Sequence, residues 1–147
     1  MVRAVLDELW SLYKVDSNVL YDISPVCALH GSDPVMVSSG LRLEGLIKDE
    51  EAVVNGKVLC AISIKGIARI DSQFVETNIA AILQGIAGVN NISNVMAILK
   101  LESKDFQFAF DLANEMQNRD LVKLLYAFQP GKIVNVEMTL EGIRQKK

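Results

Sequence analysis

The sequence predicts an α+β fold: a single domain over residues 1–147, with a mainly antiparallel or mixed sheet and helices packed on one face. Half of the 147 residues are hydrophobic and only three are proline, which is typical of a folded globular chain. Apolar residues follow helical spacing in some segments and alternate in others. Two short apolar segments flank Asn55-Gly56, a strong β-hairpin signal. Hairpins mixed with helices indicate an α+β domain, and no linker divides the chain.

The first expected element is a helix over residues 2–14. Apolar side chains such as Val5, Leu6 and Leu9 recur three and four positions apart, with charged residues between them. The following segment is ambiguous. Its alternatives are short strands at residues 19–23 and 26–30 around Pro25, a turn at 30–34, and a strand beginning at 35–37.

The β pattern is clearer from Leu41 to about residue 70. Leu41 and Leu43 alternate with charged residues, and the hairpin pairs residues 52–54 with 57–59. The second hairpin strand is expected to continue as far as Ile70, with Gly66 marking a bulge.

The second half predicts alternating helices and strands. Ser72 is a suitable cap for a helix from residue 73 to about 84. The further expected elements are a strand at 95–101, a helix at 106–116, a helix or helical continuation at 120–128, a type II turn at 129–132, and a strand from 133 to about 140. Residues 106–111 also alternate as a strand would, so a strand at 106–112 stays open as the alternative. The basic residues 144–147 are expected to form a frayed tail.

Composition excludes several classes of site. Cys27 and Cys60 are too few for a disulfide framework and are expected to be buried, reduced thiols. One histidine and no paired-cysteine spacing predict no metal site and no cofactor. The N-terminus lacks a continuous apolar region, and the uncharged run 77–99 contains seven polar residues. We therefore expect a soluble, cytoplasmic protein with no membrane partner.

The leading functional hypothesis is a non-enzymatic module that binds itself or another protein. It rests mainly on what the sequence lacks, because few residues are suited to catalysis and the net charge is only −3. The mean hydropathy of +0.26 is high for a small soluble protein and favours a covered apolar surface. An apolar and aromatic helical face is the expected interface. Its candidate residues are Phe74, Ile79, Ile82, Phe106 and Phe110.

Two alternatives remain open. Nucleic acid would be bound by basic residues of the central segment, namely Arg42, Lys57, Lys65 and Arg69, together with the C-terminal tail. The absence of aromatic residues between Asp22 and Gln73 argues against a stacking surface there. A small thiol-dependent enzyme would use Cys27 with His30 as its base, provided that the chain bends so that the two side chains meet.

Overall fold

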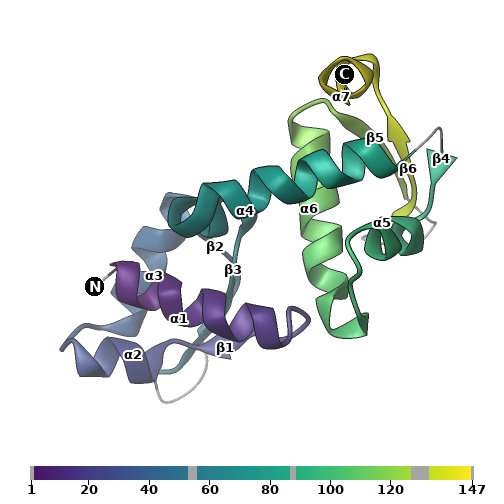
Figure 1. The fold of residues 1–147 in the computed structure, drawn as a ribbon. Helices are drawn as coiled ribbons and strands as arrows, with labels where there is room; N and C mark the ends of the chain where they lie inside the picture. Colours follow the sequence, from purple (N-terminus) through teal and green to yellow (C-terminus); the bar gives the residue numbers. More distant parts are fainter. Residues whose placement is uncertain (1, 53–55, 87–88, 127–132, 147) are drawn as a thin grey trace. The chain divides into compact units, whose positions relative to one another are not determined.

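The computed structural model describes residues 2–52, 56–86, 89–126 and 133–146 (Figure 1). The fold is α+β, as the sequence predicts, with helices packed against small antiparallel sheets. The chain divides into two compact units, Met1–Ser72 and Gln73–Lys147, here called unit 1 and unit 2. The boundary falls inside helix α4, Ile64–Gly85, so this helix contributes to both units. Non-helical angles at Asp71 (φ −147°, ψ 81°) interrupt the helix next to the boundary. The sequence predicts one domain over the whole chain and indicates no internal boundary at residue 72.

Unit 1 places a three-stranded sheet among four helical segments. Its elements are α1 (Val2–Val15), β1 (Tyr21–Asp22), α2 (Ser24–Leu29), α3 (Pro34–Leu43), β2 (Ile47–Ala52), β3 (Val58–Ile62) and the first part of α4. The strand order is β1-β3-β2, and both pairings are antiparallel. Buried apolar side chains from α1, α3, β3 and α4 form its core, including Leu6, Leu41, Ile62 and Ile67.

Unit 2 follows the same plan. Its elements are the second part of α4, β4 (Val89–Asn90), α5 (Ile92–Ile98), a 3-10 turn (Ser103–Asp105), α6 (Phe106–Asn118), β5 (Val122–Tyr126), β6 (Ile133–Met138) and α7 (Leu140–Lys146). The strand order β4-β6-β5 again places the last strand between the other two. The core includes Ile82, Leu112, Met116 and Val136. The two units are therefore repeats of one structural plan.

The junction between the hairpin and its following helix shows how closely the plan is repeated. In unit 1 the Ser63 hydroxyl donates to the Gly45 carbonyl (2.6 Å) and accepts from the Gly66 N–H (3.0 Å). The Ser63 N–H donates to the Leu46 carbonyl (3.1 Å). This network fixes the start of α4 against the end of α3.

Unit 2 builds the same junction from different residues. The Thr139 hydroxyl donates to the Asp120 carbonyl and accepts from the Gly142 N–H (3.1 Å). The Thr139 N–H donates to the Leu121 carbonyl (3.1 Å). Asp120 and its counterpart Gly45 both have positive φ, 60° and 72°. The two junctions thus match residue by residue. Their sequences, Ser-Ile-Lys-Gly-Ile at 63–67 and Thr-Leu-Glu-Gly-Ile at 139–143, share a hydroxyl residue, an apolar residue, a glycine and an isoleucine.

Several predicted elements are confirmed. These are the N-terminal helix, the β2–β3 hairpin, the helices at 73–84 and 106–116, and the final strand. The register of the hairpin differs by one from the predicted pairing of 52–54 with 57–59, because Ala52 lies opposite Val58 instead of Leu59. The predicted hairpin turn includes Asn55, and the predicted type II turn covers residues 129–132. Both turns involve positions outside the described residues.

Other predictions were wrong in type. Residues 26–29, 35–37 and 41–43 are helical, in α2 and α3, because Pro25 and Pro34 occupy first helical turns, where a missing N–H costs nothing. The β3 strand ends at Ile62, and Gly66 lies in α4 rather than in a bulge. Residues 95–98 belong to helix α5, which begins at an Asn91 capping box. Residues 122–126 form strand β5 instead of a helix.

The C-terminal tail is also ordered, contrary to the prediction of fraying. Residues 144–146 belong to α7. The Gln84 side chain donates to the Lys146 carbonyl (2.6 Å), and the Lys146 ammonium donates to the Ile86 carbonyl (3.3 Å). These contacts attach α7 to the end of α4 within unit 2. Over the described part of the chain, we find no helix that combines the length and apolar character needed to cross a membrane.

Candidate functional site

Helices α2 and α3 form a helix–turn–helix that is followed directly by the β2–β3 hairpin. The turn contains Gly31, whose φ of 65° lies in the left-handed region that favours glycine. The Ser32 N–H donates to the Cys27 carbonyl (3.0 Å) and closes the end of α2. The next helix then begins at Pro34, with Asp33 as its cap.

Local sequence explains both ends of α3. The Asp33 carboxylate accepts a hydrogen bond from the Val35 N–H (3.1 Å), which satisfies one of the unpaired donors of the first turn. The helix ends before Gly45, where the positive φ of 72° turns the chain toward β2. Leu41 faces the core and is 1% exposed.

A carboxylate of β2 also contacts two side chains of α3, the buried Ser38 and the exposed Arg42. The Ser38 hydroxyl, which is buried, donates to one Glu50 oxygen (2.8 Å). The Arg42 guanidinium lies 3.1 Å from the other Glu50 oxygen. Glu50 follows the irregular position Asp49 in β2 (φ 55°). Arg42, the single basic residue of α3, is thereby paired within unit 1.

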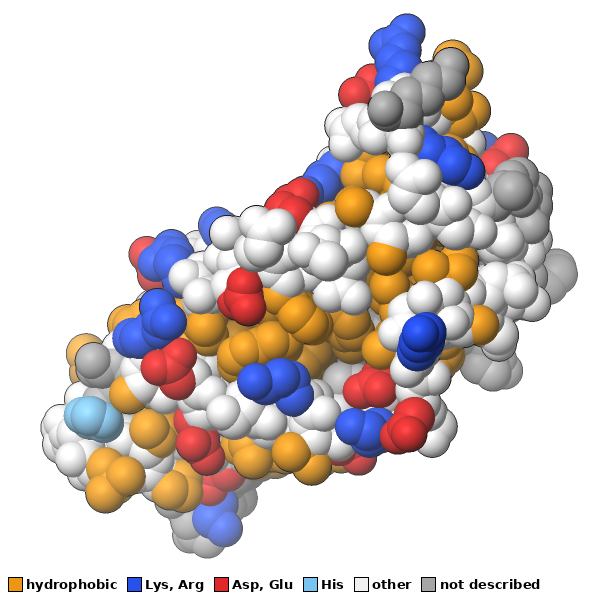
Figure 2. Space-filling view, in the orientation of Figure 1, with side chains coloured by type: hydrophobic (Ala, Val, Ile, Leu, Met, Phe, Trp, Pro, Cys, Tyr) orange, Lys and Arg blue, Asp and Glu red, His pale blue; other side chains and the backbone are white. Residues whose placement is uncertain are grey.

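The outer side of α3 is apolar. Met36 is 74% exposed and Leu43 is 81% exposed, and helical spacing places them on one side with the exposed Gly40 between them. Val35 is 44% exposed beside Met36, and Leu29 at the end of α2 is 84% exposed. Figure 2 shows hydrophobic side chains at the surface over α2. We call Val35, Met36, Gly40 and Leu43 the α3 face.

The equivalent side of α6 in unit 2 is mostly polar, with the half-buried Phe110 as the counterpart of Val35. At the end of α3, the Leu46 N–H donates to the Leu41 carbonyl (2.9 Å). At the end of α6, the Leu121 N–H donates to the Met116 carbonyl (2.9 Å) in the same way. Leu41 and Met116 are therefore equivalent, and both are buried. Counting along each helix from this pair, Met36 corresponds to Asp111 and Leu43 to Asn118. The fold consequently tolerates polar side chains at the positions where α3 exposes Met36 and Leu43.

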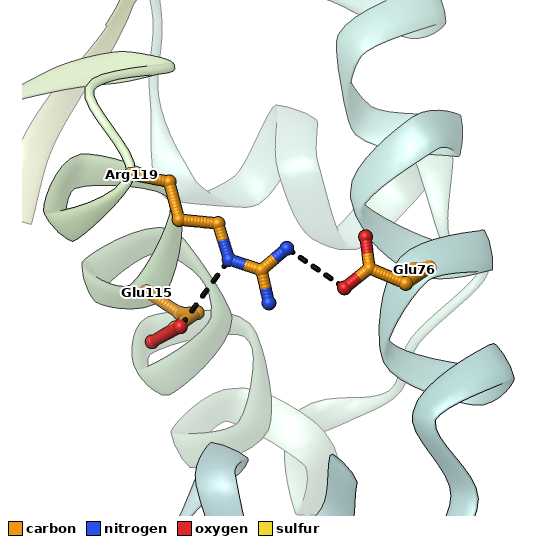
Figure 3. A network of polar contacts seen from close by, with 3 residues as sticks. All are labelled: Glu76, Glu115 and Arg119. Carbon is orange, nitrogen blue, oxygen red and sulfur yellow. Dashed lines mark hydrogen bonds and ion pairs between the residues drawn. The ribbon is translucent and has the colours of Figure 1, made fainter.

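The charged residue after the last turn also differs between α6 and α3. Arg119, the counterpart of the exposed Glu44, lies 2.8 Å from a Glu76 oxygen and 3.3 Å from a Glu115 oxygen (Figure 3). Burial lowers the pKa of Arg119, but the hydrogen bonds to the two carboxylates outweigh burial and raise it. The charges at this end of α6 are thus satisfied inside unit 2.

The predicted aromatic face is divided by the structure. Ile79 and Ile82 are 3% and 0% exposed and belong to the core of unit 2. Phe74 is half-buried against Phe108, with ring centroids 5.7 Å apart. Phe106 is 42% exposed, and the half-buried Phe110 lies beside it at 6.5 Å between centroids. Of the five candidates, Phe106 therefore presents the most open apolar surface.

The predicted basic residues do not gather on one face of the sheet. Arg42 lies on α3, paired with Glu50. Lys57 precedes β3, whereas Lys65 follows it on α4, so these two exposed side chains lie at opposite ends of the strand. Arg69 is exposed one helical turn after Lys65.

Cys27 and His30 lack the features of a catalytic pair. Cys27 is a buried free thiol in α2, whereas His30 is exposed after the last residue of that helix. Burial raises the pKa of Cys27, and the carboxylates of Asp22 and Asp33 add to the increase. A nucleophilic thiolate requires the opposite shift. Within the described ranges, moreover, we find no group of three or more metal-ligating side chains suited to an ion.

The α3 face could not have been found from the sequence patterns used above, because residues 35–37 resemble the start of a strand. The available signal is Asp33-Pro34, a helix cap followed by a favoured first residue. Comparison with protein-family models gives no match to this chain, and comparison with curated proteins gives none either.

Proposed function

We propose that this chain is a non-enzymatic protein-binding module that docks a partner on the α3 face. The observation that carries the proposal is the contrast between the repeats: Met36 and Leu43 are exposed where unit 2 has Asp111 and Asn118. Since the fold accepts polar residues at these positions, folding alone does not require the apolar ones. Burying such side chains at an interface contributes about 1.5–3 kcal/mol each.

The setting that suits this proposal is the cytoplasm. Cys27 and Cys60 are both free thiols, as expected in a reducing compartment. The proposed activity uses neither thiol and requires no cofactor.

The direct test replaces the α3 face by its counterpart in unit 2. The double variant Met36→Asp/Leu43→Asn carries side chains that the repeated fold already accommodates, so we expect it to fold normally. Wild type and variant would be purified gently from the source cells, and co-purifying proteins would be quantified by mass spectrometry. We expect a stoichiometric partner with the wild type and at least a tenfold loss with the variant. Equal recovery of every co-purifying protein would contradict the proposal.

Nucleic-acid binding is a second candidate, favoured by one observation. A helix–turn–helix commonly places its second helix in the major groove of DNA. The residues of α3 fit this role poorly: Arg42 is its one side chain of the Arg, Lys, Asn and Gln types that read base edges, and it is paired with Glu50. Duplex binding that weakens steeply with salt, and that is lost on Lys57→Gln/Lys65→Gln substitution, would support this candidate.

A further inference from the structure

The α3 face contains a gap at Gly40. A Cβ at this position would meet no atom within 4 Å among the described residues, and Gly40 does not have the positive φ that favours glycine. Glycine inside a helix is destabilising relative to alanine. The described fold therefore gives no reason for a glycine here. An approaching helix would use the space, since small residues allow two helix backbones to come close.

Two carboxylates mark the ends of this face. Asp33 precedes Met36 by three residues and Glu44 follows Gly40 by four, so helical spacing places both near the apolar stripe. Both residues are exposed. The nearby Arg42 is paired with Glu50, and Lys65 approaches the Gly45 end. Lys65 partly offsets the charge at the Glu44 end, whereas Asp33 marks the more negative end. Unit 1 as a whole has seven basic and ten acidic residues, and this net negative charge favours a basic ligand.

The same carboxylates disfavour a second copy of this chain as the occupant. In a two-fold dimer the same patch of each copy faces the other. Antiparallel α3 helices would bring Asp33 toward Glu44 of the other copy, and parallel helices would bring each carboxylate toward its own equivalent. Like charges placed opposite one another oppose association.

We propose that the occupant of the α3 face is an amphipathic helix of another protein. This helix crosses α3 at Gly40, packs apolar side chains against Met36 and Leu43, and carries Lys or Arg near the ends of its apolar stripe. The inference rests on the proposed function and adds the chemical class of the partner.

The test uses two synthetic helical peptides with the same leucine stripe, one flanked by lysines and the other by glutamates. Each is roughly 18 residues long, or five turns. Fluorescence anisotropy with the full chain should show at least tenfold tighter binding of the lysine peptide at low salt. This preference should shrink at about 0.5 M salt, where surface charges are screened. Asp33→Asn/Glu44→Gln should reduce it without abolishing binding.

Position 40 tests the crossing point. Gly40→Ala adds one methyl group and should retain at least part of the affinity, whereas Gly40→Leu should weaken the lysine peptide at least tenfold. Both variants should remain folded, because the position is open and both residues favour helix. If wild type and Gly40→Leu bind the lysine peptide equally, the partner helix does not cross α3 at Gly40. If wild type binds the two peptides equally, the partner helix does not need Lys or Arg beside its apolar stripe.

Two further outcomes separate this inference from the proposed function. If neither peptide binds but a partner is still lost with Met36→Asp/Leu43→Asn, the helical occupant is wrong and the docking function stands. If light scattering shows a dimer that this double variant dissociates, the occupant is a second copy, and the inference is overturned.

Discussion

At the residue scale, two glycines fill equivalent places where a side chain would collide with the backbone. A Cβ at Gly66 would overlap the Leu46 carbonyl oxygen, and a Cβ at Gly142 would overlap that of Leu121. Because these obstacles are backbone atoms, neither can turn aside as a flexible side chain does. Each glycine therefore allows a helix to start directly against the preceding helix–strand connection.

We predict that Gly66→Ala and Gly142→Ala each lower the free energy of unfolding by roughly 1–3 kcal/mol, as overpacking substitutions do. Gly40→Ala is the matched control and should be neutral or stabilising, because its Cβ meets open space among the described residues. Chemical denaturation of the three variants measures these differences. A loss at Gly40 as large as at Gly66 would contradict the assignment of open space.

The two thiols give a prediction about pH. Burial raises the pKa of Cys60 to about 12, with smaller contributions from Glu50, Cys27 and Asp22. Because the folded pKa exceeds the unfolded one, the stabilisation is complete below the unfolded pKa and is lost as pH rises through the folded value. Stability should therefore fall between about pH 9 and pH 12. Cys60→Ala should show a shallower fall in denaturation midpoint over this window, and an unchanged slope would contradict the account.

At the element scale, α3 depends on its N-cap residue, Asp33. The Asp33 carboxylate accepts from the Val35 N–H, so Asp33→Ala should destabilise the chain by about 1 kcal/mol, the usual cost of losing a cap. Asn caps helices as well as Asp does, so Asp33→Asn should retain most of this stability. Thermal unfolding of the Asp33→Ala and Asp33→Asn variants separates the contribution of the capping hydrogen bond from that of the negative charge. Equal losses in both variants would show that the charge dominates.

Sequence patterns predict the longer elements better than the short ones. Residues 2–14 repeat apolar side chains over several turns, so their helical period is clear. Residues 106–111 alternate as a strand would, and it is the longer pattern to residue 116 that favours the observed helix. Helix α2 has six residues and α5 has seven, which gives too few turns to establish a period. Strand β5 contains consecutive apolar residues that fit either type. Its Leu124 N–H donates to the Gln117 side chain (2.8 Å), a contact that local patterns do not reveal.

The residues of the proposed α3 face were not among those predicted from the sequence. An exposed apolar helical face is what the composition indicates, but Ile79 and Ile82 prove to be buried, whereas Met36 and Leu43 are exposed. Exposure depends on which side of a helix meets the core. That could not be worked out for α3 while residues 35–37 resembled a strand.

At the scale of the whole molecule, the two units repeat one fold but differ in charge and in exposed surface. The two units share element order, strand order and the hydrogen bonds of their junctions. They differ in charge: unit 1 has three more acidic than basic residues, and unit 2 has eight of each. The exposed faces of α3 and α6 differ as well. The four-residue segments 43–46 and 140–143 resemble one another in sequence but are not structural equivalents, since residues 140–143 correspond to 64–67.

The division into units predicts the pattern of local opening. We expect hydrogen exchange on the intact chain to show two groups of amides, each with its own opening free energy. Gly66→Ala should accelerate exchange mainly in residues before Ser72, and Gly142→Ala mainly after it. Uniform acceleration across the chain by either variant would show that the two units open together.

Photo-crosslinking from equivalent positions tests the docking function most directly. A photoreactive amino acid would replace Met36 in one variant and its counterpart Asp111 in the other, and adducts formed in the source cells would be identified by mass spectrometry. The account predicts a discrete protein adduct from position 36 that disappears when Leu43→Asn is added, with no such adduct from position 111. The same adducts from both positions, or none from position 36, would contradict the assignment of the α3 face as a docking surface.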